Sequence, residues 1–411
     1  MISDLGIGLL VVFVFLLLKR FLDPSALGKL RGPGRKSWFT GNLEEIFAKD
    51  GWNFTRYLEK EYGTLVKLYG LMSREFLYTS EPEILTQILV KEQDTFDETD
   101  EFVQLNQLLF GTGLLSTLGD HHRKQRRLIV PAFSTRRLRE MTPIMYSITH
   151  KASSTIQAIV KRTGVSGPSE VNLLEWLGRI AAGVICETGL GHTFDTFEEN
   201  QNNPYADAVK ELSPSVIELA WARPLIPMLV KLGPSDLRKA IVKIIPLQSV
   251  QKLYRIVEMM HSTSTRIFED KKKDLSNNET TLDNAKDIMS ILLKQNLEVD
   301  SGERLSDTEL LGQMSTLTFA ATDTTSNTLA RIFSLLSTHT AEQEALRREI
   351  LVNAPDGDLD YEKLLSLPYL DAICRKLANV PAHPLRWQDN SQGSCDTALA
   401  ARHNGNWGAA P

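Results

Sequence analysis

The chain has 411 residues, of which 42% are hydrophobic and 24% are charged, and its formal net charge is −5. This length can bury a large core in one or two domains, and the negative charge argues against nucleic acid as the main partner. The cysteines Cys186, Cys374 and Cys395 are odd in number and widely spaced, which argues against a disulfide framework or a zinc knuckle.

The N-terminal segment from Leu5 to Leu18 carries no charged residue. We expect Ile2–Leu22 to form a single-pass membrane anchor, because charged residues at its ends can snorkel to the interface. A buried core helix and a cleaved signal peptide are the alternatives, and a signal peptide would place its positive charges before the apolar run. Here the basic residues follow it: Lys19, Arg20, Lys29, Arg31, Arg35 and Lys36. Positive charge stays in the cytosol, so we expect the bulk of the chain there.

The next elements are a hinge and a hairpin. Residues 23–42 are basic and rich in proline and glycine, which predicts a hinge at the membrane surface. Residues Thr64–Gly70 and Glu75–Ser80 have the composition of strands with a turn between them. After Pro82 the hydrophobic period is helical almost throughout. The predicted fold class is mainly α with a small N-terminal β element.

The longest predicted helix lies in the C-terminal half. A polar loop at 269–285 and a short amphipathic helix at Lys286–Asn296 precede it. Ser306 and Glu309 have the spacing of a capping box, and apolar periodicity continues to about Leu336. Such a helix would be about 45 Å long, enough to cross an entire domain.

One face of this helix combines small, hydroxyl and acidic residues. The helical period places these residues on one face: Met314, Leu317, Ala321, Thr324 and Thr328. Ala320 and Ala321 leave space beside the Thr324 hydroxyl, and Asp323 is adjacent. This arrangement could hold a small polar ligand and pass protons to it. The alternative is a buried helix whose threonines bond their own i−4 carbonyls.

Two segments then resemble a known family. The segment AATDTT, Ala320–Thr325, resembles the central-helix signature Ala/Gly-Gly-x-Asp/Glu-Thr-Thr/Ser of the cytochrome P-450 haem-thiolate monooxygenases, with an alanine in place of the usual glycine. The segment HRKQRRLIVPAFS, His122–Ser134, is similar to the family's Trp-x-x-x-Arg helix followed by Pro-x-Phe-Ser. Without that flanking motif, the basic run would be read as a solvated helix face. Further segments in family order extend to Arg375.

The resemblance implies the cytochrome P-450 fold, a haem cofactor and an enzyme of the endoplasmic reticulum membrane that inserts one oxygen atom into an apolar organic substrate. It makes Asp323 and Thr324 the catalytic acid–alcohol pair that delivers protons to dioxygen. The residues that it places at the haem are His122, Arg126, Ala320 and Ala321. An NADPH-dependent reductase would supply electrons by docking on basic residues such as Arg123, Lys124 and Arg127.

The resemblance stops after Arg375. The family continues with a Glu-x-x-Arg helix, Pro-Pro, several strands and a loop Phe-x-x-Gly-x-Arg-x-Cys-x-Gly, whose cysteine is the thiolate ligand of the haem iron. Cys395 lacks every other position of that loop, and Cys186 and Cys374 lie within predicted helices. We therefore expect no metal-binding residue in this chain.

The C-terminal segment 376–411 has no sustained period and a Gly/Ala/Asn-rich end. Codons for Arg375 to Asn390 can be chosen so that reading one nucleotide later gives Glu-Ser-Leu-Arg-Met-Tyr-Pro-Pro-Ile-Pro-Phe-Val-Gly-Arg-Thr-Thr, which restores the family order. We predict an anchor at 1–22, a hinge at 23–42, an incomplete, truncated monooxygenase domain at 43–375 and a disordered out-of-frame tail at 376–411. The chain as written is expected to be inactive. The alternatives are a membrane-anchored helical binding protein without haem and a gene-model artefact.

Overall fold

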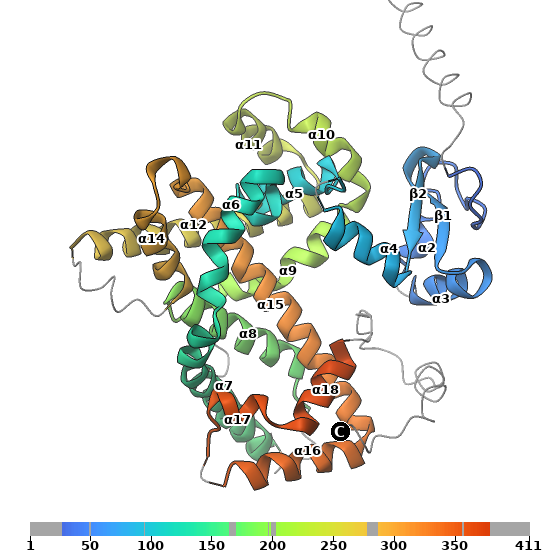
Figure 1. Ribbon diagram of the computed structural model, residues 1–411. Coiled ribbons are helices and arrows are strands. Elements are labelled where there is room, and N and C mark those ends of the chain that lie inside the picture. The colour runs from blue at the N-terminus through green and yellow to red at the C-terminus, as the bar shows by residue number, and fades with distance from the viewer. Residues whose placement is uncertain are drawn as a thin grey trace, which may run out of the picture. The chain divides into compact units, whose positions relative to one another are not determined.

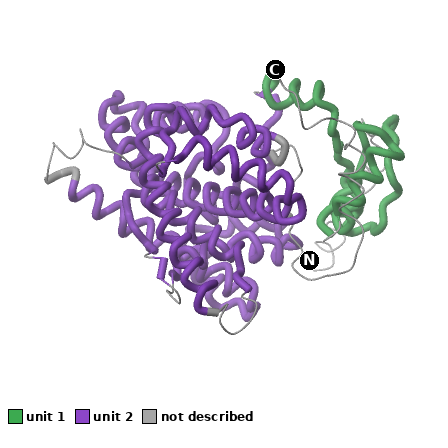
Figure 2. The backbone as a smooth tube through the Cα atoms, turned by 90° about the horizontal axis from the view of Figure 1, so that it is seen from below, with its two compact units in different colours: residues 1–92, 382–411 green, residues 93–381 purple. Residues whose placement is uncertain are grey.

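The computed structural model describes residues 27–48, 51–93, 95–163, 170–195, 197–198, 203–277, 287–355 and 357–378. They fall into two compact units, one with the described residues up to 92 and one with those from 93 onward (Figure 2). The predicted anchor over Ile2–Leu22 and the predicted tail beyond Ala378 lie outside the described residues.

The first unit is built around a two-stranded hairpin. Its elements are α2 (Leu43–Ile46), α3 (Gly51–Tyr62), β1 (Leu65–Tyr69), η1 (Leu71–Ser73), β2 (Glu75–Thr79), α4 (Pro82–Thr86) and η2 (Gln87–Lys91). The strands are antiparallel, with Leu65 opposite Thr79 and Tyr69 opposite Glu75. The side chains of Leu58, Val66 and Leu68 are fully buried between α3 and the sheet. The predicted hairpin is confirmed.

The described residues of the second unit form helices joined by turns and loops, without a strand (Figure 1). Its first half contains α5 (Asp100–Phe110), η3 (Leu114–Ser116), α6 (Gly119–Ile129), η4 (Val130–Phe133), α7 (Thr135–Thr163), α8 (Leu173–Leu190), α9 (Pro204–Glu218), η5 (Ala220–Leu225), α10 (Ile226–Leu229) and α11 (Ser235–Ile244). Its second half contains α12 (Gln248–Asn277), α14 (Ile288–Glu298), η6 (Ser301–Glu303), α15 (Asp307–Thr338), α16 (Thr340–Asn353), α17 (Tyr361–Leu365) and α18 (Pro368–Ala378). The predicted fold class, mainly α with a small β element, is confirmed.

Helix α15 is the central element of this unit, with α8, α9 and α12 packed beside it (Figure 1). Its start is fixed locally: the Ser306 side chain accepts from the backbone of Glu309, and the Glu309 side chain accepts from the backbone of Ser306. The predicted capping box is therefore confirmed. Leu310 and Met314, both at most 1% exposed, anchor α15 in the largest apolar cluster of the described residues.

The backbone of α15 also approaches the turn after α5 very closely. A Cβ atom added at Gly312 would lie 2.7 Å from the backbone nitrogen of Gly113, and one added at Gly113 would lie 2.8 Å from the carbonyl oxygen of Gly312. Side chains are excluded at both positions because the opposing atoms belong to the backbone and cannot move aside cheaply. This glycine crossing fixes the first third of α15 against the end of α5.

The sequence-based end of α12 and the predicted amphipathic character of α14 were wrong. Helix α12 continues to Asn277 through much of the predicted polar loop, because Lys271 bonds the Asp287 carboxylate at 3.0 Å and Lys272 bonds that of Asp307 at 2.5 Å. Helix α14 is buried on nearly all sides over 288–293 rather than amphipathic, because it packs against both α8 and α6.

The prediction of a single-pass membrane anchor is corrected. Among the residues described, which begin at 27, no helix combines the length and the apolar character that crossing a membrane requires. The helices of sufficient length, α7, α8, α12 and α15, carry charged and hydroxyl side chains that would be costly in hydrocarbon.

Candidate functional site

The small-residue and hydroxyl stretch lies in the middle of α15, with Ala321 packed against the largest apolar cluster of the described residues. Ala320 and Ala321 are half-buried, and Thr324 and Thr328 are exposed. The Thr324 hydroxyl donates to the carbonyl oxygen of Ala320 at 2.7 Å. The i−4 bond that the structural alternative predicts is therefore present, but on an open surface rather than in a buried helix.

Asp323 points to a different side of α15. Its carboxylate accepts from the Ser213 hydroxyl of α9 and from the Asn327 amide, both at 3.5 Å. Burial raises the pKa of the Asp323 carboxyl, and the two hydrogen bonds offset part of that rise. Among the described residues no hydrogen bond joins Asp323 to Thr324, so the structure does not bring the predicted acid and alcohol into direct contact.

The predicted haem-contacting residues of α6 are divided between a half-buried and an exposed environment. His122 is half-buried, and its pKa is lowered first by burial and then by the charges of Arg126 and Arg123. Arg126 is exposed, and no hydrogen bond or ion pair connects its side chain to another described residue.

A buried polar network that sequence reasoning missed joins α6 to α15 instead. The fully buried amides of Gln125 and Gln313 are hydrogen-bonded at 2.8 Å. Gln313 Oε1 also accepts from the backbone of Leu114 at 3.1 Å. Gln125 Nε2 donates to Glu309 Oε1 at 3.3 Å, and His121 contacts the same oxygen at 2.6 Å. The network holds the helix of His122 and Arg126 on the helix of Asp323 and Thr324.

An apolar pocket of about 520 Å³ lies between α5, α9, η5 and α15. Its apolar lining residues are Phe102, Leu105, Leu109, Phe110, Leu212, Val216, Ile217 and Phe319. Its polar and charged lining residues are Glu98, Thr99, Glu101, Asn106, Ser213 and Arg223. Ser213 belongs to both this pocket and the Asp323 site, so the pocket adjoins the acid of α15.

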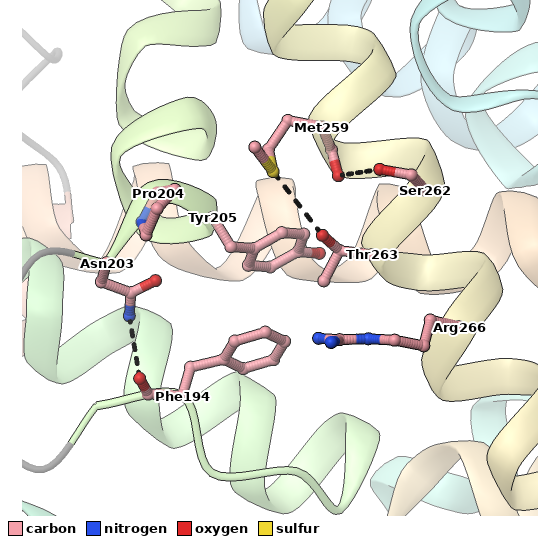
Figure 3. Close-up of a pocket in the computed structure, with 8 residues that line it drawn as sticks. All are labelled: Phe194, Asn203, Pro204, Tyr205, Met259, Ser262, Thr263 and Arg266. Atoms are coloured by element: carbon pink, nitrogen blue, oxygen red, sulfur yellow. Dashed lines mark hydrogen bonds between the residues drawn. The ribbon is translucent and has the colours of Figure 1, made fainter.

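A second pocket, of about 440 Å³, lies between α9, α12 and the segment around Phe194 (Figure 3). The rings of Phe194 and Tyr205 stack with their centroids 4.8 Å apart, and the Arg266 side chain points toward Phe194 (Figure 3). Burial raises the pKa of Tyr205 to about 12. No residue of α15 lines this pocket, so we do not assign the acid–alcohol chemistry to it.

The described cysteines do not fit the thiolate ligand of a haem. Cys186 is 1% exposed within α8, and burial raises the pKa of its thiol far above the usual range. Cys374 is exposed on α18, where burial followed by the charge of Asp371 raises its pKa. A metal ligand must be a thiolate, which the core environment of Cys186 disfavours. The described residues also contain no group of three or more metal-ligating side chains. Cys395 lies outside the described residues.

The chain was also compared with known proteins. The family profile described as Cytochrome P450 matches residues 31–375. Cytochrome P450 monooxygenase 81 of Postia placenta is 41% identical over 382 residues, covering 92% of this chain and 69% of the relative. Cytochrome P450 monooxygenase 212 of the same fungus is 41% identical, and the match covers 86% of this chain and 65% of the relative. Ganoderic acid synthetase CYP5150L8 of Ganoderma lucidum is 34% identical, and the match covers 90% of this chain and 68% of the relative. The chain thus spans about two thirds of the length of these relatives.

Proposed function

The chain belongs to the cytochrome P450 family, and we propose that the apolar pocket beside α15 is its substrate site. The cofactor of this family is haem, and the two Postia placenta relatives are named monooxygenases. The observation that carries the proposal is the shared position of Ser213, which lines the pocket and bonds the Asp323 carboxylate. A substrate in this pocket would have an apolar body, because eight of the side chains around it are hydrocarbon or aromatic.

The proposed roles of the site residues follow their environments. The small side chains of Ala320 and Ala321 would leave room for the haem, and the haem, when bound, supplies the activation of dioxygen. Asp323 would hold a proton, since its pKa is raised by burial. The exposed Thr324 hydroxyl, which does not contact Asp323, would be a separate polar group beside Ala320. His122 and Arg126 would contact the haem propionates, where the unpaired guanidinium suits a carboxylate.

The proton-holding role of Asp323 predicts a specific pH dependence of stability. Its folded-state pKa is raised, so ionisation disfavours the folded state and the stability that it contributes is lost as pH rises above the unfolded value of about 3.9. The Asp323→Asn variant should therefore gain stability relative to the parent as pH rises from about 4 to about 7. Urea unfolding of both proteins across this range measures the difference.

Asp120→Asn is the matched control for this experiment. Hydrogen bonding to Arg123 lowers the Asp120 pKa, so the parent gains on that variant as pH rises to the unfolded value of about 3.9, and the difference should be nearly constant from about pH 5 to about 7. A stability difference between the parent and Asp323→Asn that does not change with pH would remove the raised pKa from the proposal.

We place the reductase on the basic face of α6. Arg127 is exposed on that helix, whereas Lys124 donates to the carbonyl oxygens of Gly302 and Arg304 at 3.1 Å each. Lys124 therefore supports the turn before α15. Arg123 pairs with Asp120 at 2.6 Å, so the docking charge falls mainly on Arg127.

We further propose that the 411-residue chain is inactive because no cysteine in it fits the thiolate ligand. A version whose coding sequence is read one nucleotide later after Arg375 should regain turnover. Supplied with haem, NADPH, a reductase and labelled dioxygen, that version should add one labelled oxygen atom to an apolar substrate, detected by mass spectrometry. Product from the 411-residue chain would contradict the inactivity, and no product from either protein would contradict the assigned site.

A further inference from the structure

Arg223 is the one arginine or lysine that lines the apolar pocket beside α15 within the described residues. It lies on η5, and its Nε atom is buried without a hydrogen-bond partner. No ion pair or hydrogen bond connects its side chain to another residue in the part of the chain that the structure describes. A buried guanidinium nitrogen without an acceptor is costly, so the position is favourable only if an acceptor comes from elsewhere.

The two acids at the pocket do not serve as that acceptor. Glu98 is exposed to solvent, and Glu101 lies in the first turn of α5, where the free backbone N–H groups already favour a negative charge. Neither carboxylate lies within 4.0 Å of Arg223, the limit for an ion pair. Among the described residues, no carboxylate therefore pairs with the half-buried Arg223, whose Nε faces an apolar wall without an acceptor.

The apolar wall runs along the whole of α5. Phe102, Leu105 and Leu109 follow the helical period on one face, and Phe110 closes that end, with its ring centroid 5.1 Å from that of Phe319. The 11 residues of α5 span about 16 Å. A ligand that fills this pocket must therefore be an extended or multi-ring hydrocarbon.

We propose that the pocket binds a monocarboxylic acid with an apolar body, and that Arg223 pairs with its carboxylate. The planar guanidinium presents two parallel N–H donors that match the two oxygens of a carboxylate. Arg223 is thereby a specificity-determining residue for a substrate of the monooxygenase, so the inference rests on the proposed function. The hydrocarbon chain packs along α5, α9 and Phe319 while the charged end stays at η5.

The test is direct binding of dodecanoate and of dodecanol to the purified 411-residue chain by isothermal titration calorimetry. Both ligands have the same hydrocarbon length, and only dodecanoate has the charge. We expect dodecanoate to bind about ten- to a hundredfold more tightly, the range of a hydrogen bond to a charged group. Arg223→Gln should remove this preference without changing dodecanol binding, and Arg223→Lys should restore part of it.

Lys239→Gln is the charge-matched control, because Lys239 is an exposed cation on the neighbouring α11 and does not line the pocket. Its preference for dodecanoate should equal that of the parent. Equal affinity of the parent for the two ligands, or an unchanged preference in a folded Arg223→Gln variant, overturns the proposal. If Arg223→Gln does not fold, the comparison of the two ligands on the parent and on Arg223→Lys decides.

The assay needs neither haem nor turnover, so its outcome is separable from that of the oxygen-labelling experiment. Labelled product without a preference for the acid would support the monooxygenase and exclude carboxylate recognition. A preference for the acid without any labelled product would support the Arg223 site and contradict the proposed reaction.

Discussion

A reduced, carbon monoxide-treated sample of the purified 411-residue chain should show no Soret band of the kind that thiolate ligation of haem produces. Haem-thiolate chemistry needs an anionic sulfur on the iron. Cys186 lies in the core with a strongly raised pKa, and Cys374 lies on a helix with a raised pKa. Loss of the ligand removes the whole monooxygenase turnover rather than a fraction of it, which makes this the largest effect that we predict.

The comparison protein for the spectrum is the version read one nucleotide later after Arg375, which should show the band. Cys395→Ser in the 411-residue chain is the second control and should leave the spectrum unchanged. A thiolate band in the parent that disappears in Cys395→Ser would identify Cys395 as the ligand and refute the prediction of inactivity.

Gln313→Leu should be the most destabilising of the stability variants considered. The substitution leaves the partly buried backbone N–H of Leu114 without its acceptor and removes the buried 2.8 Å bond to Gln125. Each buried polar group left unpaired costs about 1–3 kcal/mol of unfolding free energy. Urea denaturation should show a lower midpoint with an unchanged m-value, since the folded surface does not change.

The matched control is Gln157→Leu on α7. Gln157 is exposed and bonds only the Ser153 hydroxyl at 3.4 Å, so its replacement should change stability by less than about 0.5 kcal/mol. Because Gln125 and Gln313 share one network, the Gln125→Leu/Gln313→Leu pair should cost less than the sum of the single variants. Equal costs for Gln313→Leu and Gln157→Leu would show that the network is not stabilising.

The elements that the sequence predicts correctly are those set by neighbours along the chain. The capping box needs only Ser306 and Glu309, three positions apart. The hairpin needs only two short β-rich segments with a turn between them. Family membership could be inferred for the same reason, because the Ala320–Thr325 motif is contiguous.

The features that the sequence does not predict depend on contacts between distant segments. Gln125 and Gln313 are 188 positions apart, and the available signal was a glutamine next to Met314 on the buried side of α15. The pocket combines α5, α9, η5 and α15, so Arg223 carries no recognisable motif. Asp323 and Thr324 are adjacent, yet successive helical residues point about 100° apart, which separates the acid from the alcohol.

The glycine crossing of Gly113 with Gly312 determines which parts of the substrate pocket can move. With backbone against backbone at this point, the end of α5 and the start of α15 cannot slide past each other without a steric clash. Phe110, three residues before the crossing, therefore keeps a fixed position in the pocket. A change in the size of the pocket therefore requires movement of η5 and the short helices after it, which form the side of the pocket that carries Arg223. The ligand would then enter, and its charge would be recognised, on the same movable side of the pocket, opposite the fixed side at Phe110.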